Sequence, residues 1–403
     1  MTRPGCSDTV KFASLYSGCG GLDLGFKNAG LSPHVSIDTD KDALATLRAN
    51  IHSTARDHDL TDWDESLVQD VAEAGVLIAG PPCQGFSTAG RNNSKDVRNA
   101  HLINVARIAA AAKPKIVVIE NVLGLLSENH SQVFEQTLGI LRSAGYCLSW
   151  EVHKTSDYGI AQQRKRVIIL ATLSQKPFEL KLKCVERVNI AQALQGVELV
   201  ESKPRPLLKT GSVEQRIARR IRPGQKLSNV RGGPRSVHTW EIPEVFGEVS
   251  RQEVSYLETI VKLRRQNRRR KIGDADPVEE SALAAYFGEQ SEGVCQALLS
   301  KGYLRRVGQY IDLTNSFNGK FRRLSWDDVA PTVDTRFGQP RYFLHPSEDR
   351  GFSVREAARI QSFPDSFEFK GSESSAYRMI GNAVPPKFSE AIAKDVLRIW
   401  NEL

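Results

Sequence analysis

Residues 10–26 read VKFASLYSGCGGLDLGF, an apolar run that breaks at a glycine-rich turn and continues as a helical pattern to about Ala29. This order predicts a strand at 10–16, a tight turn and a helix. Four further runs are β-branched and apolar throughout, at 34–37, 76–80, 115–121 and 166–172. Helical patterns such as 41–50 lie between such runs. Continuous apolar strands separated by helices indicate a sheet buried on both faces, so we predict an α/β fold with a doubly wound, mostly parallel sheet.

The character of the chain changes after Thr172, where periodicity fades and arginines become frequent, and it returns at Val354. Between Thr172 and Arg350 there are 31 Lys+Arg and 22 Asp+Glu, a surplus of +9, against 24 and 25 in the remainder. We therefore predict a catalytic and cofactor-binding domain at 1–184 that resumes at 346–403, with a smaller domain, 185–345, inserted into it. The basic surplus suits a surface that neutralises phosphates, and a solvated basic face would explain it equally well.

The composition is that of an ordinary globular protein, with 25% charged and 40% hydrophobic residues. No apolar stretch approaches the roughly 18–20 residues of a membrane span, and the N-terminus lacks the apolar core of a secretory signal. We expect a cytoplasmic protein. The six cysteines form no CxxC pair and the eight histidines lack ligand spacing. We therefore expect neither a disulfide framework nor a bound metal.

The glycine-rich turn contains Gly18, Gly20 and Gly21, which permit positive φ and a close approach of a ligand to the backbone. Asp38 ends the second predicted strand, where an acid can accept hydrogen bonds from ribose hydroxyls. Such a turn is shared by NAD, FAD and S-adenosylmethionine sites and can be purely structural. Asp38 can equally be an acid at the N-terminus of the following helix.

Residues 79–90, AGPPCQGFSTAG, place a cysteine beyond a corner stiffened by Pro81 and Pro82. The prolines fix the position of the Cys83 thiol at the end of a parallel strand, where ligands bind. A thiolate there would be a nucleophile. The ordinary alternative is a buried, inert cysteine.

Another strand ends in Glu120 and Asn121, so that a partly buried carboxyl group can donate a proton near neutral pH. The alternative for Glu120 is an acid that caps the next helix. Arg164 and Arg166 lie two apart on an incoming strand, where two guanidinium groups could hold a planar acceptor or a phosphate. The alternative for these arginines is solvation at a sheet edge. The stretch 88–99 is predicted to be a loop that could close over a ligand, with Arg91, Lys95 and Arg98 reaching phosphates, or an ordinary solvent loop.

Taken together, the motifs resemble a known family. SLYSGCGGLDLGF, GPPCQGFS, ENV, QQRKR, VREAARIQSFPDSF and YRMIGNAVPP follow one another in the order found in the DNA (cytosine-5)-methyltransferases. The resemblance covers about 1–171 and 350–400. The basic insert occupies the position of that family's target-recognition domain, and matches it in position and basicity alone.

The resemblance implies a Rossmann-like methyltransferase fold and a catalytic set of Cys83, Glu120, Arg164 and Arg166. Cys83 would add to C6 of a flipped cytosine, Glu120 would protonate or hydrogen-bond N3, and the arginines would contact the base and nearby backbone. It places the remaining DNA contacts at Gln84, Ser87, Arg91, Arg98 and Asn121. It assigns S-adenosylmethionine to Tyr16, Gly18, Gly20, Leu22, Asp38, Asp59, Pro81, Asn382 and Val384. At Asp59 the chain reads HDL, which departs from the family's usual glycine-preceded Asp-Ile.

We therefore expect a prokaryotic, sequence-specific DNA (cytosine-5)-methyltransferase that is monomeric, acts in restriction–modification or defence beside a cognate endonuclease, and associates with the nucleoid. The compact length motivates the restriction–modification assignment. Recognition residues are expected between Arg216 and Arg341, where arginines can pair with guanine. Three alternatives remain: a tRNA cytosine-5 methyltransferase, an NAD-dependent oxidoreductase, and a catalytically silent DNA-binding module. The oxidoreductase leaves the cysteine, glutamate and arginines without a role.

Overall fold

The structure is a computed structural model that describes residues 9–51, 54–82, 100–201, 205–230, 232–266, 275–315 and 317–403. The chain divides into two compact units. Unit 1 comprises Met1–Ser202, Val329–Thr335 and Val354–Leu403, and unit 2 comprises Lys203–Asp328 and Arg336–Ser353. Unit 2 is thus inserted into unit 1.

The sequence predicted the first boundary at residue 184. In the structure it lies further along the chain, after Ser202. A short helix, α6 (Ile190–Leu194), belongs to unit 1. The guanidinium group of Arg359, on α12 (Val354–Ile360), donates to the backbone oxygens of Gln195 and Gly196 and fastens this segment to unit 1.

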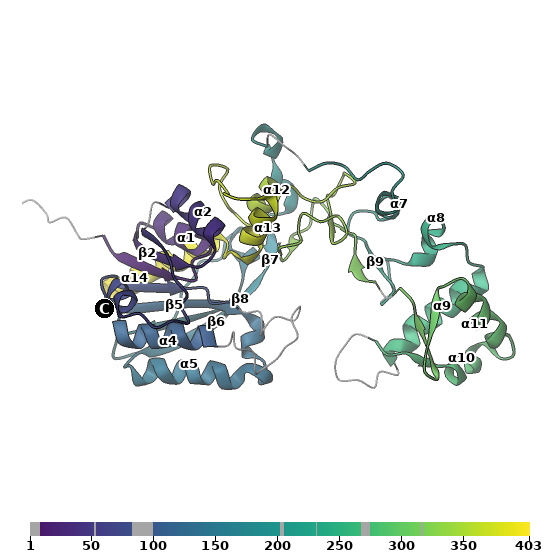
Figure 1. The fold of residues 1–403 in the computed structure, drawn as a ribbon, viewed down its shortest axis with the longest axis horizontal. Helices are drawn as coiled ribbons and strands as arrows, with labels where there is room; N and C mark the ends of the chain where they lie inside the picture. The colour runs from purple at the N-terminus through teal and green to yellow at the C-terminus, as the bar shows by residue number, and fades with distance from the viewer. Residues whose placement is uncertain are drawn as a thin grey trace, which may run out of the picture. The chain divides into compact units, whose positions relative to one another are not determined.

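Unit 1 is built on a seven-stranded sheet in the order β3-β2-β1-β4-β5-β8-β6 (Figure 1). The strands are β1 (Lys11–Leu15), β2 (Ser32–Asp38), β3 (Thr54–Asp57), β4 (Val76–Ala79), β5 (Ile116–Val122), β6 (Cys147–Lys154) and β8 (Lys165–Thr172). The pairs β1–β2, β2–β3, β1–β4 and β4–β5 are parallel, whereas β8 runs antiparallel to both β5 and β6. The predicted mostly parallel α/β sheet is confirmed. The antiparallel direction of β8 (166–172 in the predicted run) could not be predicted, because an apolar run reports burial on both faces and carries no information about direction.

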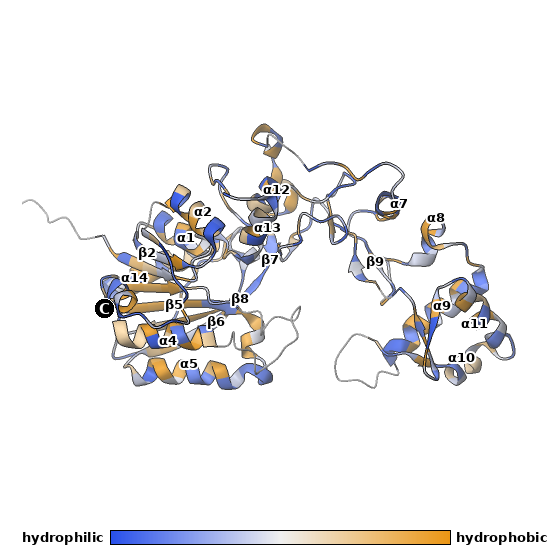
Figure 2. Cartoon of the chain, viewed as in Figure 1, coloured by the Kyte–Doolittle hydropathy of each residue, from blue (hydrophilic) through white to orange (hydrophobic). Residues whose placement is uncertain are grey.

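Alternate residues of each strand enter two separate cores. On β4, Leu77 and Ala79 pack with helices α3 (Glu65–Ala72), α4 (Ala100–Ala112) and α5 (Ser131–Ser143). Val76 and Ile78 face the other way, toward helices α1 (Gly21–Asn28) and α14 (Pro386–Glu402). Figure 2 shows the strands largely in the hydrophobic colour between helices of mixed character. Helices on both faces make the sheet doubly wound.

The remaining elements of unit 1 are α2 (Lys41–Ile51), α13 (Glu373–Asn382) and the short strands β7 (Gln162–Gln163) and β16 (Ala330–Pro331), which pair in parallel. The strand order reverses at β1 and β4, which are adjacent and parallel. Ligands of doubly wound sheets bind beyond the carboxyl ends of the strands at such a reversal. The glycine-rich turn follows β1, and the Pro81–Pro82 corner follows β4, so the topology brings the two predicted motifs to one edge.

Unit 2 contains three small sheets, β10-β9-β14, β11-β13-β12 and β15-β17. Its strands are β9 (Lys226–Ser228), β10 (Ser236–Val237), β11 (Val278–Glu279), β12 (Leu304–Val307), β13 (Tyr310–Leu313), β14 (Asn318–Lys320), β15 (Arg322–Arg323) and β17 (Phe343–Leu344). Its helices are α7 (Val213–Arg220), α8 (Pro243–Phe246), α9 (Arg251–Gln266), α10 (Glu280–Phe287) and α11 (Gln290–Ser300).

The helix α9 corrects the expectation of an irregular insert. Tyr256, Leu257, Ile260 and Val261 recur at helical spacing and are buried in a core of unit 2. The signal was present in the sequence and was masked by the arginines around it. Within the described part of the chain, no helix combines the length and apolar character that crossing a bilayer requires.

Candidate functional site

The turn after β1 holds three alternate positions of unusual backbone. Tyr16, Gly18 and Gly20 have φ values of 54°, 54° and 88°, in the left-handed region that only glycine adopts at little cost. A Cβ built on Gly18 would meet nothing within 4 Å, so the backbone there faces open space. Gly20 forms the N-cap of α1. The turn therefore offers an accessible backbone at a helix N-terminus, as a nucleotide-like ligand requires.

Asp38 ties this turn to the end of β2. Its Oδ2 accepts the backbone N–H of Gly18 at 2.8 Å, and its Oδ1 accepts those of Thr39 and Asp40 at 2.8 and 2.9 Å. The carboxylate thus positions the turn and also caps the chain before α2. Two carboxylate oxygens carry about four acceptor sites, so Asp38 retains capacity for a hydroxyl donor.

Gly21 has a different role from the one expected. It does not have a positive φ, and a Cβ there would lie 2.5 Å from the backbone oxygen of Val384 and 3.0 Å from the Ala383 Cβ. The missing side chain admits the GNAVPP segment rather than a ligand. Leu22 and Val384 are 4% and 6% exposed and share one core, so they support the turn by packing beneath it in the interior. Asn382 ends α13 at an exposed position.

Tyr16 reaches from the turn to α4. Its hydroxyl lies 3.0 Å from Nδ1 of His101, and the two rings meet edge to face with centroids 5.3 Å apart. Burial, followed by the charges of Asp59 and Asp38, raises the pKa of Tyr16 above its usual range. The phenol therefore stays protonated and can donate to His101. His101 was not predicted as a residue of this site, because nothing near it in the sequence links it to the glycine turn.

Asp59 lies in the exposed loop after β3. Its Oδ1 accepts the backbone N–H and the hydroxyl of Thr61 at 2.9 and 2.8 Å. These two bonds, the backbone one first, lower the pKa of Asp59. Its charge acts on Tyr16, which places it at the same end of the site. The turn, the open face of Gly18 and the two carboxylates together fit the ribose and adenine of S-adenosylmethionine.

The corner after β4 meets the end of β5. A Cβ at Gly80 would lie 3.8 Å from the backbone oxygen of Tyr16 and 3.9 Å from Oε2 of Glu120. Asn121 is 2% exposed; its Oδ1 accepts the Val122 N–H at 2.8 Å and its Nδ2 lies 3.5 Å from the Pro81 oxygen. The predicted acid, proline corner and glycine turn therefore meet at one place. Asn121 holds the corner rather than facing outward.

Glu120 and Arg166 form an ion pair, with Nε and Oε1 2.6 Å apart. The two side chains are 10% and 12% exposed, so the pair is largely withdrawn from water. The guanidinium group also donates to the Lys165 oxygen at 2.7 Å. The register of β5 and β8 sets Val122 opposite Arg166 and so brings the guanidinium group close to Glu120. The ion pair then orients the Glu120 carboxylate.

Arg164 has separate partners. It is 3% exposed, and its Nη1 donates to the backbone oxygens of Gly381 and Val333 at 3.0 and 3.3 Å. Arg164 precedes β8, whereas Arg166 lies within it. Arg164 instead fastens Val329–Thr335 to the end of α13.

Two buried glutamines reinforce this fastening. Nε2 of Gln361 donates to the Ile380 and Ala383 oxygens at 2.9 and 2.7 Å. Its Oε1 accepts from the Gln162 amide, whose own Oε1 accepts the Val333 N–H at 3.1 Å. Both glutamines are 0% exposed. The network positions the turn before Val384, and the backbone of Val384 lies against Gly21.

The predicted nucleophile and loop contacts lie outside the described residues: Cys83, Gln84, Ser87, Arg91, Lys95 and Arg98. Among the thiols in the described part, Cys19 is fully buried, which raises its pKa to about 12. Cys19 is consequently an inert thiol although it lies in the glycine turn. In that same part of the chain, no group of three or more His, Cys, Asp or Glu side chains could hold a metal ion.

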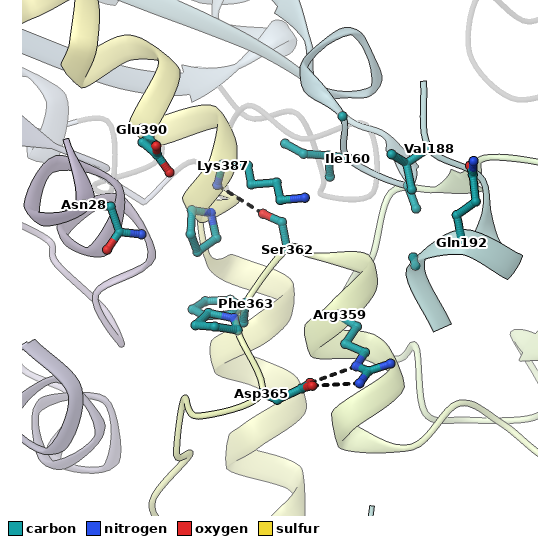
Figure 3. A pocket seen from close by; sticks show the side chains of 15 residues that line it. Asn28, Ile160, Val188, Gln192, Arg359, Ser362, Phe363, Asp365, Lys387 and Glu390 are labelled. Carbon is teal, nitrogen blue, oxygen red and sulfur yellow. Dashed lines mark hydrogen bonds and ion pairs between the residues drawn. The ribbon is translucent and has the colours of Figure 1, made fainter. Parts of the chain in front are cut away.

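A cavity of about 520 Å³ in unit 1 lies elsewhere, and none of the predicted site residues lines it (Figure 3). Arg359 lines this cavity and binds Asp365 through two hydrogen bonds of 2.8 and 2.7 Å. Ser362 accepts the Lys387 N–H at 3.2 Å on another side. Since these polar groups satisfy one another, the cavity offers a ligand little specific binding.

The chain was also compared with known proteins. A sequence profile of the C-5 cytosine-specific DNA methylase family matches residues 10–398. The chain is 27% identical over 428 residues to the Type II methyltransferase M.NlaIV of Neisseria lactamica, covering 96% of this chain and 99% of that one. It is 26% identical over 434 residues to M.BanI of Aneurinibacillus aneurinilyticus, covering 96% of each. The solved structure of Entamoeba histolytica methyltransferase EhMeth shares the fold with a TM-score of 0.57 at 14% identity, covering 98% of this chain and 99% of that one.

Proposed function

Since the chain belongs to the C-5 cytosine-specific DNA methylase family and is a DNA cytosine-5 methyltransferase, as the resemblance predicted, we propose that it methylates cytosine within one specific duplex sequence, using S-adenosylmethionine. The observation that supports this most strongly is the meeting of Gly80, Tyr16 and Glu120 at the edge of the sheet. An acid, the chain that leads to the cysteine, and the cofactor turn are thereby within reach of one ring.

The residues of the turn hold the cofactor. Asp38 accepts from the ribose, Asp59 accepts from the adenine amino group, and the open backbone of Gly18 admits the methionine moiety. The resemblance also assigns Pro81, Asn382 and the buried Val384 to the cofactor. When bound, S-adenosylmethionine supplies an electrophilic methyl group on a sulfonium.

The target cytosine must leave the base stack, because C5 and C6 are inaccessible within the duplex. The Cys83 thiolate adds to C6 while Glu120, oriented by Arg166, gives a proton or hydrogen bond to N3 and takes up the charge that builds in the ring. C5 would then carry the electron pair that bonds to the methyl carbon, while the sulfur–methyl bond would break and leave its electron pair on the sulfur, so that the sulfonium would depart as a neutral thioether. Loss of the C5 proton to a base expels the thiolate from C6 and restores aromaticity.

We further propose that unit 2 is the target-recognition domain and that the protein serves a restriction–modification or defence system in a prokaryotic cytoplasm, with a cognate endonuclease. The two relatives named above are Type II methyltransferases from bacteria, which supports this assignment. The tRNA reading is disfavoured by the same relatives, and a competition between tRNA and duplex DNA for methyl transfer decides between them.

The test is transfer of a labelled methyl group to duplex DNA, with bisulfite sequencing of host DNA to identify the target. Cys83→Ser is expected to abolish transfer and also trapping on 5-fluorocytosine DNA. The exposed free thiol Cys184 provides the matched control, Cys184→Ser, which keeps full activity. Full activity in Cys83→Ser would show the mechanism to be wrong.

A further inference from the structure

The antiparallel strand pair of β9 and β14 in unit 2 carries a cluster of cations around a backbone irregularity. The register shifts between Asn318 and Lys320, and Gly319 at the shift has a φ of 71°. A Cβ on Gly319 would lie 3.3 Å from Cδ of Lys226 and 3.4 Å from Nη2 of Arg322. Two long basic side chains thus converge on a residue that has no side chain of its own.

The ring of Tyr342 contacts two cations, one of them outside this strand pair. Nζ of Lys320 lies 4.0 Å, and Cζ of Arg336 4.4 Å, from the centre of its ring, which is the geometry of cation–π contacts. The backbone oxygen of Tyr342 accepts the N–H of Arg322 at 3.0 Å. The charge of Lys320, and then a bond from Arg336, lower the pKa of Tyr342. The ring therefore joins Lys320 and Arg336 to the cations at Gly319.

Within the described residues, neither Lys320 nor Arg322 is paired with a carboxylate, and burial lowers the pKa of Arg322. The next residue differs: Arg323 binds Asp349 at 2.6 Å and donates to four backbone oxygens of its own unit. Arg323 is thus structural, whereas the half-buried Arg322 carries a charge that calls for an anion from outside the protein.

We propose that this phosphate seat, formed by Lys226, Lys320, Arg322 and Arg336 around Tyr342, binds consecutive phosphates of the DNA duplex. The inference rests on the proposed function and deepens it. Duplex DNA carries about one negative charge per 1.7 Å of axis, which a cluster of one sign can neutralise. The guanidinium groups can bind phosphate through two bonds each, and the lysines act as point charges. The seat fixes the position of unit 2 on DNA without reading the sequence.

The salt dependence of binding tests this directly. Fluorescence anisotropy with a labelled duplex of about 30 base pairs is measured across a range of NaCl concentrations for wild type and for the double variant Lys320→Gln, Arg322→Gln. Each lost phosphate contact reduces the slope of log K against log salt by about 0.9. We expect a reduction of nearly 2, and binding weakened roughly 10- to 100-fold near 0.1 M salt. Lys320→Arg, which keeps the charge, is expected to keep the slope.

The matched control is Arg306→Gln, in the same unit. Arg306 is exposed and paired with Glu280, so the loss of its single positive charge is expected to leave the slope unaltered. The phosphate seat is refuted by an unchanged slope of log K against log salt in the double variant. It is also refuted if Arg306→Gln reduces this slope as much as the double variant does. A fall seen with tRNA but not with duplex DNA also overturns it. Methyl transfer by wild type is measured in parallel: if wild type methylates DNA while the slopes coincide, the seat alone is wrong, whereas wild type that methylates no DNA contradicts the proposed function itself.

Discussion

The ion pair between Glu120 and Arg166 predicts that the two residues act as one unit in catalysis. The atoms are 2.6 Å apart and the side chains are 10% and 12% exposed. Breaking a buried pair by removing one partner costs about 3–5 kcal/mol. Positioned general acid–base catalysis contributes roughly 10²–10⁴-fold to the rate, and Arg166→Gln leaves Glu120 in place without its partner, so we expect the lower end of that range, about 3 kcal/mol. Since about 1.4 kcal/mol is tenfold in rate, Arg166→Gln should lower kcat/KM by roughly 100-fold.

A double-mutant cycle measures this coupling. Glu120→Gln, which removes the proton-transferring group, should cost roughly 10²–10⁴-fold in kcat/KM. If Arg166 acts only by orienting Glu120, the double variant will be no slower than Glu120→Gln alone. Single-turnover methyl transfer to a cognate duplex gives the rates.

The control is the exposed pair Arg142–Glu135, 3.7 Å apart with side chains 52% and 63% exposed. Substituting either partner with Gln should change little, because surface pairs contribute at most about 1 kcal/mol. If instead the losses of Arg166→Gln and Glu120→Gln multiply in the double variant, Arg166 contacts the base or backbone independently and the positioning role is refuted.

Two further predictions concern α1 and the packing of the glycine turn. Burial raises the pKa of Asp23 from its usual 3.8 to about 6, against the bonds from Ser36 and Ser14. Between these values the folded state holds the extra proton, so stability falls as pH rises from about 4 to about 6, by about 3 kcal/mol. Urea unfolding of wild type against Asp23→Asn should show wild type losing that much relative to the variant across this window, and a constant difference contradicts the assignment. Gly21→Ala would place a Cβ 2.5 Å from the Val384 oxygen and should lower both the melting temperature and the calorimetric affinity for S-adenosylmethionine. Gly139→Ala in α5, with nothing within 4 Å, should raise stability by up to about 1 kcal/mol, and equal effects of the two substitutions would refute the packing argument.

Much of the site was accessible from the sequence, because its residues follow strand ends in short motifs. Glu120 and Asp38 are predicted at the ends of apolar strands, and both lie there. The glycine turn has the positive φ values expected at Gly18 and Gly20. His101 could not be found in this way, since its contact with Tyr16 joins residues 85 positions apart. The partners of Arg164 could not be predicted for a similar reason: one of its acceptors lies on Gly381, 217 positions away.

The sequence alone determined that an α/β sheet forms and where its strands end, because burial and backbone freedom are properties of neighbouring residues. Only the tertiary structure decided that β8 runs antiparallel, that Gly21 receives Val384 rather than a ligand, and that Arg166 rather than Arg164 holds Glu120. Each of these depends on which distant segment packs against a given residue. Close packing and the need to satisfy every buried polar group select that segment for the chain as a whole, so local patterns do not encode it.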